Sequence, residues 1–137
     1  MHPSRIEHLV EAAIYADDLE QAEAFYHDVL GLEVLTKEPG RHVFFRVGNS
    51  VLLIFRAEQT LKGGFLPPHG TTGPGHFALG IPTESFDGWE DHLADHGVEI
   101  EKQVEWPKGG KSIYFRDPAG NSVELATRGL WGLAEGW

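Results

Sequence analysis

The chain has 137 residues, the length of one ordinary domain, and its 41% hydrophobic and 23% charged residues are typical of a globular protein. It carries 11 basic and 21 acidic residues, and a net charge of −10 disfavours nucleic acid and anionic membranes as partners. The absence of cysteine excludes disulfides, thiolate chemistry and zinc sites with cysteine ligands. No apolar run follows the first five residues, so we expect no signal peptide, no spanning helix and a cytoplasmic protein.

The first half of the chain is predicted to form a β-α-β-β-β module over about residues 6–56. Residues 6–16 are rich in apolar side chains and partly alternate, which favours a strand. Asp18 is then typical of a helix start, and apolar residues follow at helical spacing until Gly31 ends the helix. Three further strands are expected at 32–36, 42–46 and 50–56.

The second half repeats this order over about residues 76–127, after a linker at 57–75 that is rich in glycine and proline. A helix is expected over 85–96, and Gly97 follows it as a stop signal. The apolar tail, 128–137, is expected to dock on the domain or on a partner chain. Strands of this half are expected at 76–81, from 98 onward, at 111–116 and at 122–127.

A short sequence repeat indicates two copies of one unit. Phe-Arg followed by Gly-Asn-Ser-Val occurs within 45–51 and again within 115–123, where the turn has three residues in place of one. Gly-Asn is common in hairpins, but four identical residues at the same place in both modules make chance the poorer explanation. The repeat predicts a pseudo-symmetric single domain over 1–137, and it aligns Leu52 with Glu124.

Three segments resemble the vicinal oxygen chelate superfamily, which includes glyoxalase I, extradiol dioxygenases, fosfomycin-resistance enzymes and bleomycin-binding proteins. They are the first helix with its flanks, the opening strand of the second module and the closing hairpin, at 15–32, 75–79 and 115–125. The resemblance covers about residues 6–127. It implies an α+β fold in which two βαβββ modules form a curved mixed sheet around a central cleft, with helices on the outer face. It also implies a homodimer.

The same resemblance places metal ligands on the first and last strand of each module, here at Glu11, Leu52, His76 and Glu124. Carboxylates and imidazole bind divalent Zn, Ni, Mn, Fe or Co, so Glu11, His76 and Glu124 are the predicted ligands. Leu52 cannot ligate, which leaves open positions for water and substrate. One His and two Glu depart from the two-His, one-Glu set of the extradiol and fosfomycin members.

Each predicted ligand also has a plainer interpretation, because a strand His can bond a backbone carbonyl and a strand Glu can face solvent. A charge that faces the interior needs a partner, which favours ligation by Glu11 and Glu124. His8 is a rival ligand, but alternation puts it on the face opposite Glu11. Weaker candidates for the substrate pocket are Tyr15, Leu52, Arg46, Arg116 and His69. A strand-end salt bridge is the alternative role for the two arginines, and an exposed loop position is the alternative for His69.

Two functions of different class follow from these residues. In the first, a divalent metal chelates vicinal oxygens of a small substrate and stabilises the charge that develops there. Glu11 or Glu124 is then the catalytic base of a lyase, isomerase or dioxygenase step. In the second, a metal-free protein binds a small molecule in an aromatic groove, as bleomycin-binding relatives do, with Trp106, Trp131 and Phe65 as candidate walls. Convergence of the three ligands discriminates between the two.

Overall fold

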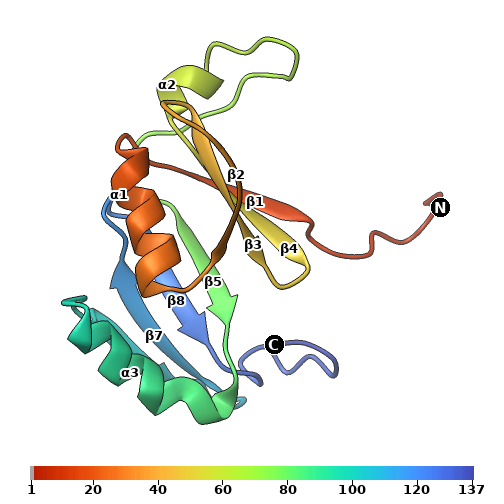
Figure 1. Ribbon diagram of the computed structural model, residues 1–137. Helices are drawn as coiled ribbons and strands as arrows, with labels where there is room; N and C mark the ends of the chain where they lie inside the picture. The colour runs from red at the N-terminus through yellow and green to blue at the C-terminus, as the bar shows by residue number, and fades with distance from the viewer. Residues whose placement is uncertain (1) are drawn as a thin grey trace.

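The computed structural model describes residues 2–137 and contains two four-stranded sheets of the same topology (Figure 1). The first sheet contains β1 (Glu11–Tyr15), β2 (Glu33–Glu38), β3 (His42–Val47) and β4 (Ser50–Phe55). The second contains β5 (His76–Gly80), β6 (Lys102–Glu105), β7 (Lys111–Arg116) and β8 (Ser122–Ala126). Their orders are β1-β4-β3-β2 and β5-β8-β7-β6. In each sheet the first strand runs parallel to its neighbour and the other pairs are antiparallel, which confirms the predicted α+β fold.

The helices begin and end near the predicted residues. The Asp18 carboxylate accepts a hydrogen bond of 3.0 Å from the backbone N–H of Gln21 and so caps the first helix. Gly31, with φ of 73°, adopts the left-handed conformation that ends this helix. A short helix in the linker was not expected from its composition. The helical segments are α1 (Leu19–Ala24), the π-helical turn η1 (Phe25–Val29), α2 (Ala57–Thr60), the 3-10 turn η2 (Thr83–Ser85) and α3 (Phe86–Asp95).

Two strands begin later than predicted. The strand expected from residue 6 begins at Glu11, and residues 2–10 run as an extended segment away from the body of the molecule (Figure 1). The strand expected from residue 98 begins at Lys102, because Val98 still donates its N–H to a carbonyl at the end of α3. No helix among residues 2–137 has the length and apolar character needed to cross a membrane.

One hydrophobic core joins the two sheets. Tyr26 of η1 packs on Phe45 of the first sheet and on Phe77 of the second, with ring centroids 5.7 Å and 6.2 Å away. Phe25, its neighbour, packs on Phe115 of the second sheet at 6.1 Å. Aromatic side chains contribute much of the burial energy of a core, so η1 acts as the common packing element of both modules.

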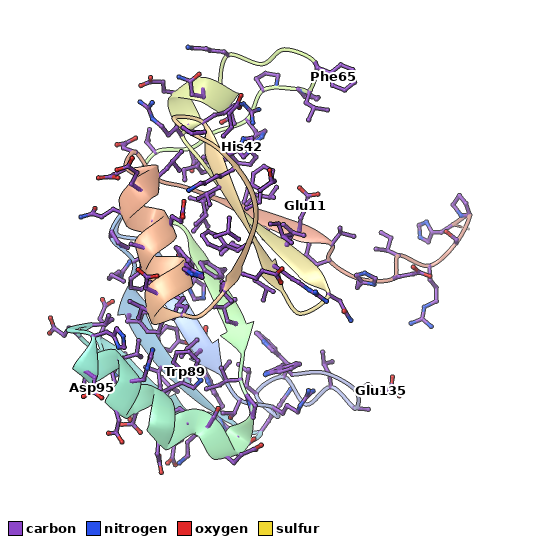
Figure 2. The ribbon with its side chains drawn as sticks, viewed as in Figure 1. Glu11, His42, Phe65, Trp89, Asp95 and Glu135 are labelled. Carbon is purple, nitrogen blue, oxygen red and sulfur yellow. The ribbon has the colours of Figure 1, made fainter. Side chains whose placement is uncertain are left out.

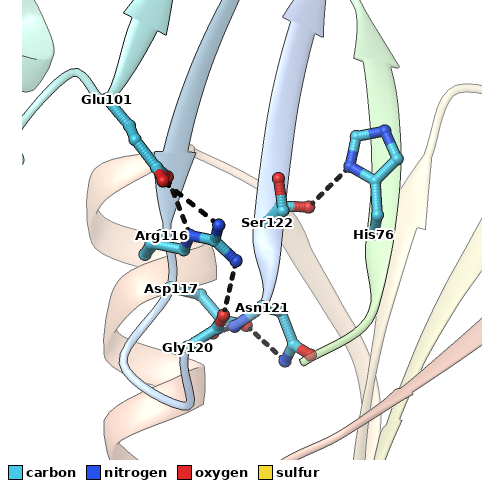
Figure 3. A network of polar contacts seen from close by, with 7 residues as sticks. All are labelled: His76, Glu101, Arg116, Asp117, Gly120, Asn121 and Ser122. Carbon is cyan, nitrogen blue, oxygen red and sulfur yellow. Dashed lines mark hydrogen bonds and ion pairs between the residues drawn. The ribbon is translucent and has the colours of Figure 1, made fainter. Parts of the chain in front are cut away.

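A buried polar network adds directional contacts between the modules. Tyr26 donates its hydroxyl proton to Asp117 over 2.8 Å, and burial together with the charge of Asp117 raises the pKa of this phenol. The Asn121 amide donates to Asp117 at 2.9 Å (Figure 3) and to the Tyr15 carbonyl at 3.2 Å. Its oxygen accepts from the Gly75 N–H at 2.8 Å. The closing turn of the second module is therefore tied to the helix and to β1 of the first.

Candidate functional site

The strand register shows which positions of the two sheets are equivalent. In the second sheet, Glu124 lies two residues beyond the residue that pairs with His76. In the first sheet, the residue two beyond the partner of Glu11 is Leu53. Phe45 pairs with Leu52, and its repeat counterpart Phe115 pairs with Val123. Leu52 is therefore the counterpart of Val123, so Leu53 is that of Glu124 and Glu11 is that of His76. Leu52 is 3% exposed and belongs to the core, so the alignment by the repeated tetrapeptide was wrong by one residue on this strand.

His76 and Glu124 form a pair on the face of the second sheet that is turned away from the core. The His76 Nδ1–H donates to the Ser122 carbonyl at 3.1 Å (Figure 3), because a carbonyl oxygen can only accept. A neutral ring then has a lone pair on Nε2, which lies 3.3 Å from Oε1 of Glu124. Two acceptors that face each other at this distance need a shared cation, either a second ring proton or a metal ion.

The Glu124 carboxylate is held from behind. Glu124 is only 5% exposed, and its Oε2 accepts a hydrogen bond of 2.6 Å from the buried Ser112 hydroxyl. The Ser112 oxygen in turn accepts from the indole N–H of Trp106 at 2.8 Å. Because the single hydroxyl proton is committed to Oε2, this relay fixes the carboxylate and leaves Oε1 directed at His76.

Tyr114 completes the polar floor of the site. It pairs with Glu124 across β7 and β8, and its ring is stacked near that of His76 with 6.1 Å between centroids. Burial, and then the charge of Glu124, raise the pKa of Tyr114, so the phenol remains a neutral donor at physiological pH. This floor opens into a pocket of about 1020 Å³ whose lining includes His76, Tyr114, Glu124, Trp106, Trp131 and Trp137.

Glu11 lies on β1, is exposed and projects on the side away from α1 (Figure 2). It borders a smaller groove of about 430 Å³ to which His76 also contributes. Among residues 2–137 of one chain, however, no three His, Asp or Glu side chains are grouped closely enough to hold one metal ion. One copy of the chain thus brings together two of the three predicted ligands and leaves Glu11 apart.

The two arginines named as weak pocket candidates hold turns at strand ends. Arg116 donates to Glu101 at 2.8 Å and to the Gly120 carbonyl at 3.1 Å (Figure 3), and its hydrogen bond lowers the pKa of the Glu101 carboxyl. Arg46 donates to the Gly48 carbonyl at 3.1 Å. Arg116 thus forms the strand-end salt bridge of the plainer interpretation, whereas the contact of Arg46 is with a backbone carbonyl of its own turn.

Tyr15 and His69 form a second polar contact, outside the pocket of His76 and Glu124. A hydrogen bond of 2.7 Å joins the Tyr15 hydroxyl to Nδ1 of His69, and burial raises the pKa of the phenol. The His69 ring packs edge-on against Phe55 with 4.9 Å between centroids. The contact fastens the linker to the first sheet.

Ser112, Tyr114 and Trp106 were missed as site residues by the sequence analysis. Ser112 and Tyr114 alternate along β7 on the face of Glu124, and the predicted hairpin contained this signal. Trp106 was considered only as a possible groove wall, and nothing in the sequence indicates its bond to Ser112. Phe65, another suggested wall, lies fully exposed in the linker loop (Figure 2) and is not part of this pocket.

Comparison with known proteins places these features in a family. The family model of the Glyoxalase/Bleomycin resistance protein/Dioxygenase superfamily matches residues 5–125. A catechol-2,3-dioxygenase of Bacillus subtilis is 30% identical over 122 residues, which are 86% of this chain and 40% of the dioxygenase. The chain thus spans less than half of that relative. Metallothiol transferase FosB of Bacillus licheniformis is 32% identical over 111 residues, or 80% of this chain and 68% of the transferase.

A solved structure matches over nearly the whole chain. The lactoylglutathione lyase from Agrobacterium tumefaciens is 40% identical and superposes with a TM-score of 0.90 over 95% of this chain and 100% of the lyase.

Proposed function

This chain belongs to the Glyoxalase/Bleomycin resistance protein/Dioxygenase superfamily, and on that premise we propose that it is a metal-dependent enzyme of glyoxalase type. Its substrate is a small molecule with two adjacent oxygens, of the class formed by a thiol and a 2-oxoaldehyde. The likeness to a lactoylglutathione lyase over the full length of both chains supports this class over a ring-opening dioxygenation. The observation that carries the metal is the pair of acceptors on His76 and Glu124.

The donor set fits a divalent ion. Ligand atoms about 2.1 Å from one ion lie roughly 3.0–3.4 Å apart at angles between about 90° and 109°. The 3.3 Å between Nε2 of His76 and Oε1 of Glu124 falls in this range. The backbone carbonyl that accepts from Nδ1 and the hydroxyl that binds Oε2 are the outer contacts that metal ligands ordinarily have.

Glu11 supplies the third ligand from a second copy of the chain in a two-fold symmetric dimer. It occupies the position equivalent to His76, yet stands apart from the pair within one chain. The segment before it is extended and carries three exposed apolar side chains, Ile6, Leu9 and Val10, as expected of a surface that a partner covers. Each of the two sites then combines His76 and Glu124 with the partner's Glu11.

The two carboxylates and the Tyr114 phenol have different roles at this site. When bound, the metal stabilises negative charge that develops on a substrate oxygen. Glu124 is held by Ser112 and stays in place. The partner's Glu11 has no such fixing bond among the described contacts, so it would be the carboxylate whose oxygen not bound to the metal takes a proton from one substrate carbon and returns it to the adjacent carbon. The neutral Tyr114 phenol lies beside the pair as a hydrogen-bond donor for the substrate.

Mixed dimers test the shared site directly. Glu11→Gln and Glu124→Gln proteins, each with a different affinity tag, are co-expressed, and the doubly tagged dimer is isolated for metal analysis. A shared site leaves one native ligand set in each mixed dimer, so we expect one tightly bound metal per dimer and none in either parent. A site within one chain restores no metal on mixing, and this result would remove Glu11 of the partner from the proposal.

Metal content and turnover test the wider claim. Protein purified without chelator should contain bound metal, and Zn, Ni, Mn, Fe or Co should raise the melting temperature of the stripped protein. A hemithioacetal of glutathione, a catechol and fosfomycin should be compared, and we expect turnover of the first. Absence of metal and of any thermal shift overturns the enzyme proposal and favours a metal-free binding protein.

A further inference from the structure

We infer that Trp137 closes one end of the pocket and makes the site selective for substrates that carry a flat apolar group beside their chelating oxygens. This inference rests on the proposed metal site and names the part of the substrate that the metal does not touch. Figure 1 shows the C-terminal segment folding back beside the ends of β5 and β8. Trp137 lines the same pocket as His76 and Glu124.

The side chains that form the floor of the pocket become smaller and less polar along the strands. Side chains alternate along a strand, so His76, Ala78 and Gly80 of β5 face the pocket in that order. On β8, Glu124 pairs with Ala78, and Ala126 pairs with Gly80. The floor therefore passes within two residues from ligating side chains to almost bare backbone. An indole occupies the space that these small residues leave.

Trp137 is seated by four contacts. A Cβ atom on Gly80 would lie 2.3 Å from Cζ2 of the indole, so only glycine permits this approach. The indole N–H donates to the Ala126 carbonyl at 2.8 Å, and the Arg128 guanidinium lies 3.9 Å from the ring centroid. The Trp137 carbonyl accepts from the backbone N–H of Trp131. A ring held from several sides is a wall of the pocket and not a loosely attached end.

The resulting pocket has two unlike ends. One end holds His76, Tyr114 and Glu124, and at the other the indole of Trp137 lies against Gly80 and Ala126. Trp131 also lines the pocket. Trp131 is 68% exposed, as expected for an aromatic side chain that contacts a ligand or a partner. A substrate that places its oxygens at the polar end directs its remaining atoms onto these rings. Flat apolar groups gain most there, because stacking on an aromatic face adds to burial.

Two chelating probes that differ only in the apolar part measure this effect. Benzohydroxamate and acetohydroxamate present the same pair of oxygens, with a phenyl or a methyl group beside them. Their dissociation constants for the Zn²⁺-loaded protein are measured by calorimetry. We expect benzohydroxamate to bind about tenfold or more tightly, which corresponds to burial of the additional ring atoms.

Two variants remove the wall from opposite sides. Trp137→Ala deletes the indole, and Gly80→Ala displaces it, because the ring at the far end of a surface segment yields before the sheet does. Both should reduce the preference for benzohydroxamate to less than about threefold and leave the affinity for acetohydroxamate unchanged. Leu133→Ala, an exposed residue of the same segment that does not line the pocket, is the matched control and should retain the full preference.

These measurements distinguish failure of the proposed role of Trp137 from failure of the proposed metal site. Protein that binds Zn²⁺ and both probes with equal affinity, or variants that retain the preference, overturn the role of Trp137 and leave the metal site intact. Protein that binds no Zn²⁺ overturns the metal site, and the inference fails with it. Circular dichroism and melting curves establish that each variant is folded.

Discussion

The two modules share one backbone plan but present different chemistry on their open faces. Glu124 of the second sheet corresponds to Leu53 of the first, and Tyr114 corresponds to Phe44. The face with Glu124 is polar and backed by hydrogen bonds, whereas the face with Leu53 has apolar side chains at both of these positions and carries Glu11 and the partly buried His42. Neither module has a complete ligand set. In the proposed enzyme, the second module would therefore fix the metal and the first would supply the base and an apolar cover.

The greatest effect on metal affinity is expected at Glu124, where the two modules differ most in chemistry. Glu124→Gln keeps the size and the bond to Ser112 but removes the negative charge, so we expect the affinity for Zn²⁺ to fall by at least about 100-fold, since even outer contacts of metal ligands contribute 10- to 100-fold. Leu53→Gln places the same amide at the equivalent position of the first sheet and should leave Zn²⁺ affinity unchanged. Calorimetric titration measures both, and equal losses would contradict the assignment of the pair.

The turn asparagines of the repeat provide a second comparison, in stability. Asn121 is 1% exposed and bonds Asp117, the Tyr15 carbonyl and the Gly75 N–H, whereas its repeat counterpart Asn49 is exposed. Asn121→Ala should lower the free energy of unfolding by about 2–4 kcal/mol, because it leaves buried partners unpaired. Asn49→Ala should change it by less than about 0.5 kcal/mol. Urea unfolding measures both, and a small loss at Asn121 would show that the network does not join the modules.

The relay behind Glu124 gives a smaller effect on metal binding. Ser112→Ala removes the donor to Oε2 and should weaken Zn²⁺ binding by about tenfold while the ligands remain. Trp106→Phe removes only the N–H that orients the hydroxyl, so its effect should be smaller and in the same direction. An unchanged affinity in Ser112→Ala protein would show that Glu124 needs no support from behind.

The sequence allowed the fold to be predicted, because apolar alternation, the Asp18 cap and the Gly31 stop are local signals. It did not allow the register of the first sheet to be predicted. The repeated tetrapeptide suggested Leu52, but Gly-Asn closes a tight hairpin in one module and ends a longer loop in the other, which shifts the pairing by one residue to Leu53. The alternation of side chains and the turn motifs in the sequence do not indicate this shift in strand pairing.

The site was predictable only in part, for a related reason. His76 and Glu124 lie on paired strands of one module, so motif and topology suffice to bring them together. In the proposed dimer, the place of Glu11 depends on how two chains assemble, which is not a local property of the sequence. The path of the tail that brings Trp137 onto Gly80 likewise depends on tertiary contacts, and the sequence indicated only that the tail would dock.

The smallest expected effect concerns His42, which occupies in the first sheet the place of Ser112 in the second. Burial, and then the nearby Arg41 guanidinium, lower the pKa of His42 below its usual value. As the pH falls below about 6.5, His42 binds a proton more readily in the unfolded chain than in the folded chain. The free energy of unfolding therefore decreases.

His42→Gln should reduce this loss between pH 7.5 and 5.5, as measured by urea unfolding at both values. An unchanged slope in His42→Gln protein would show that the packing of His42 against Phe44 and Phe55 does not hinder its protonation, and would contradict the apolar surroundings inferred for this part of the first sheet.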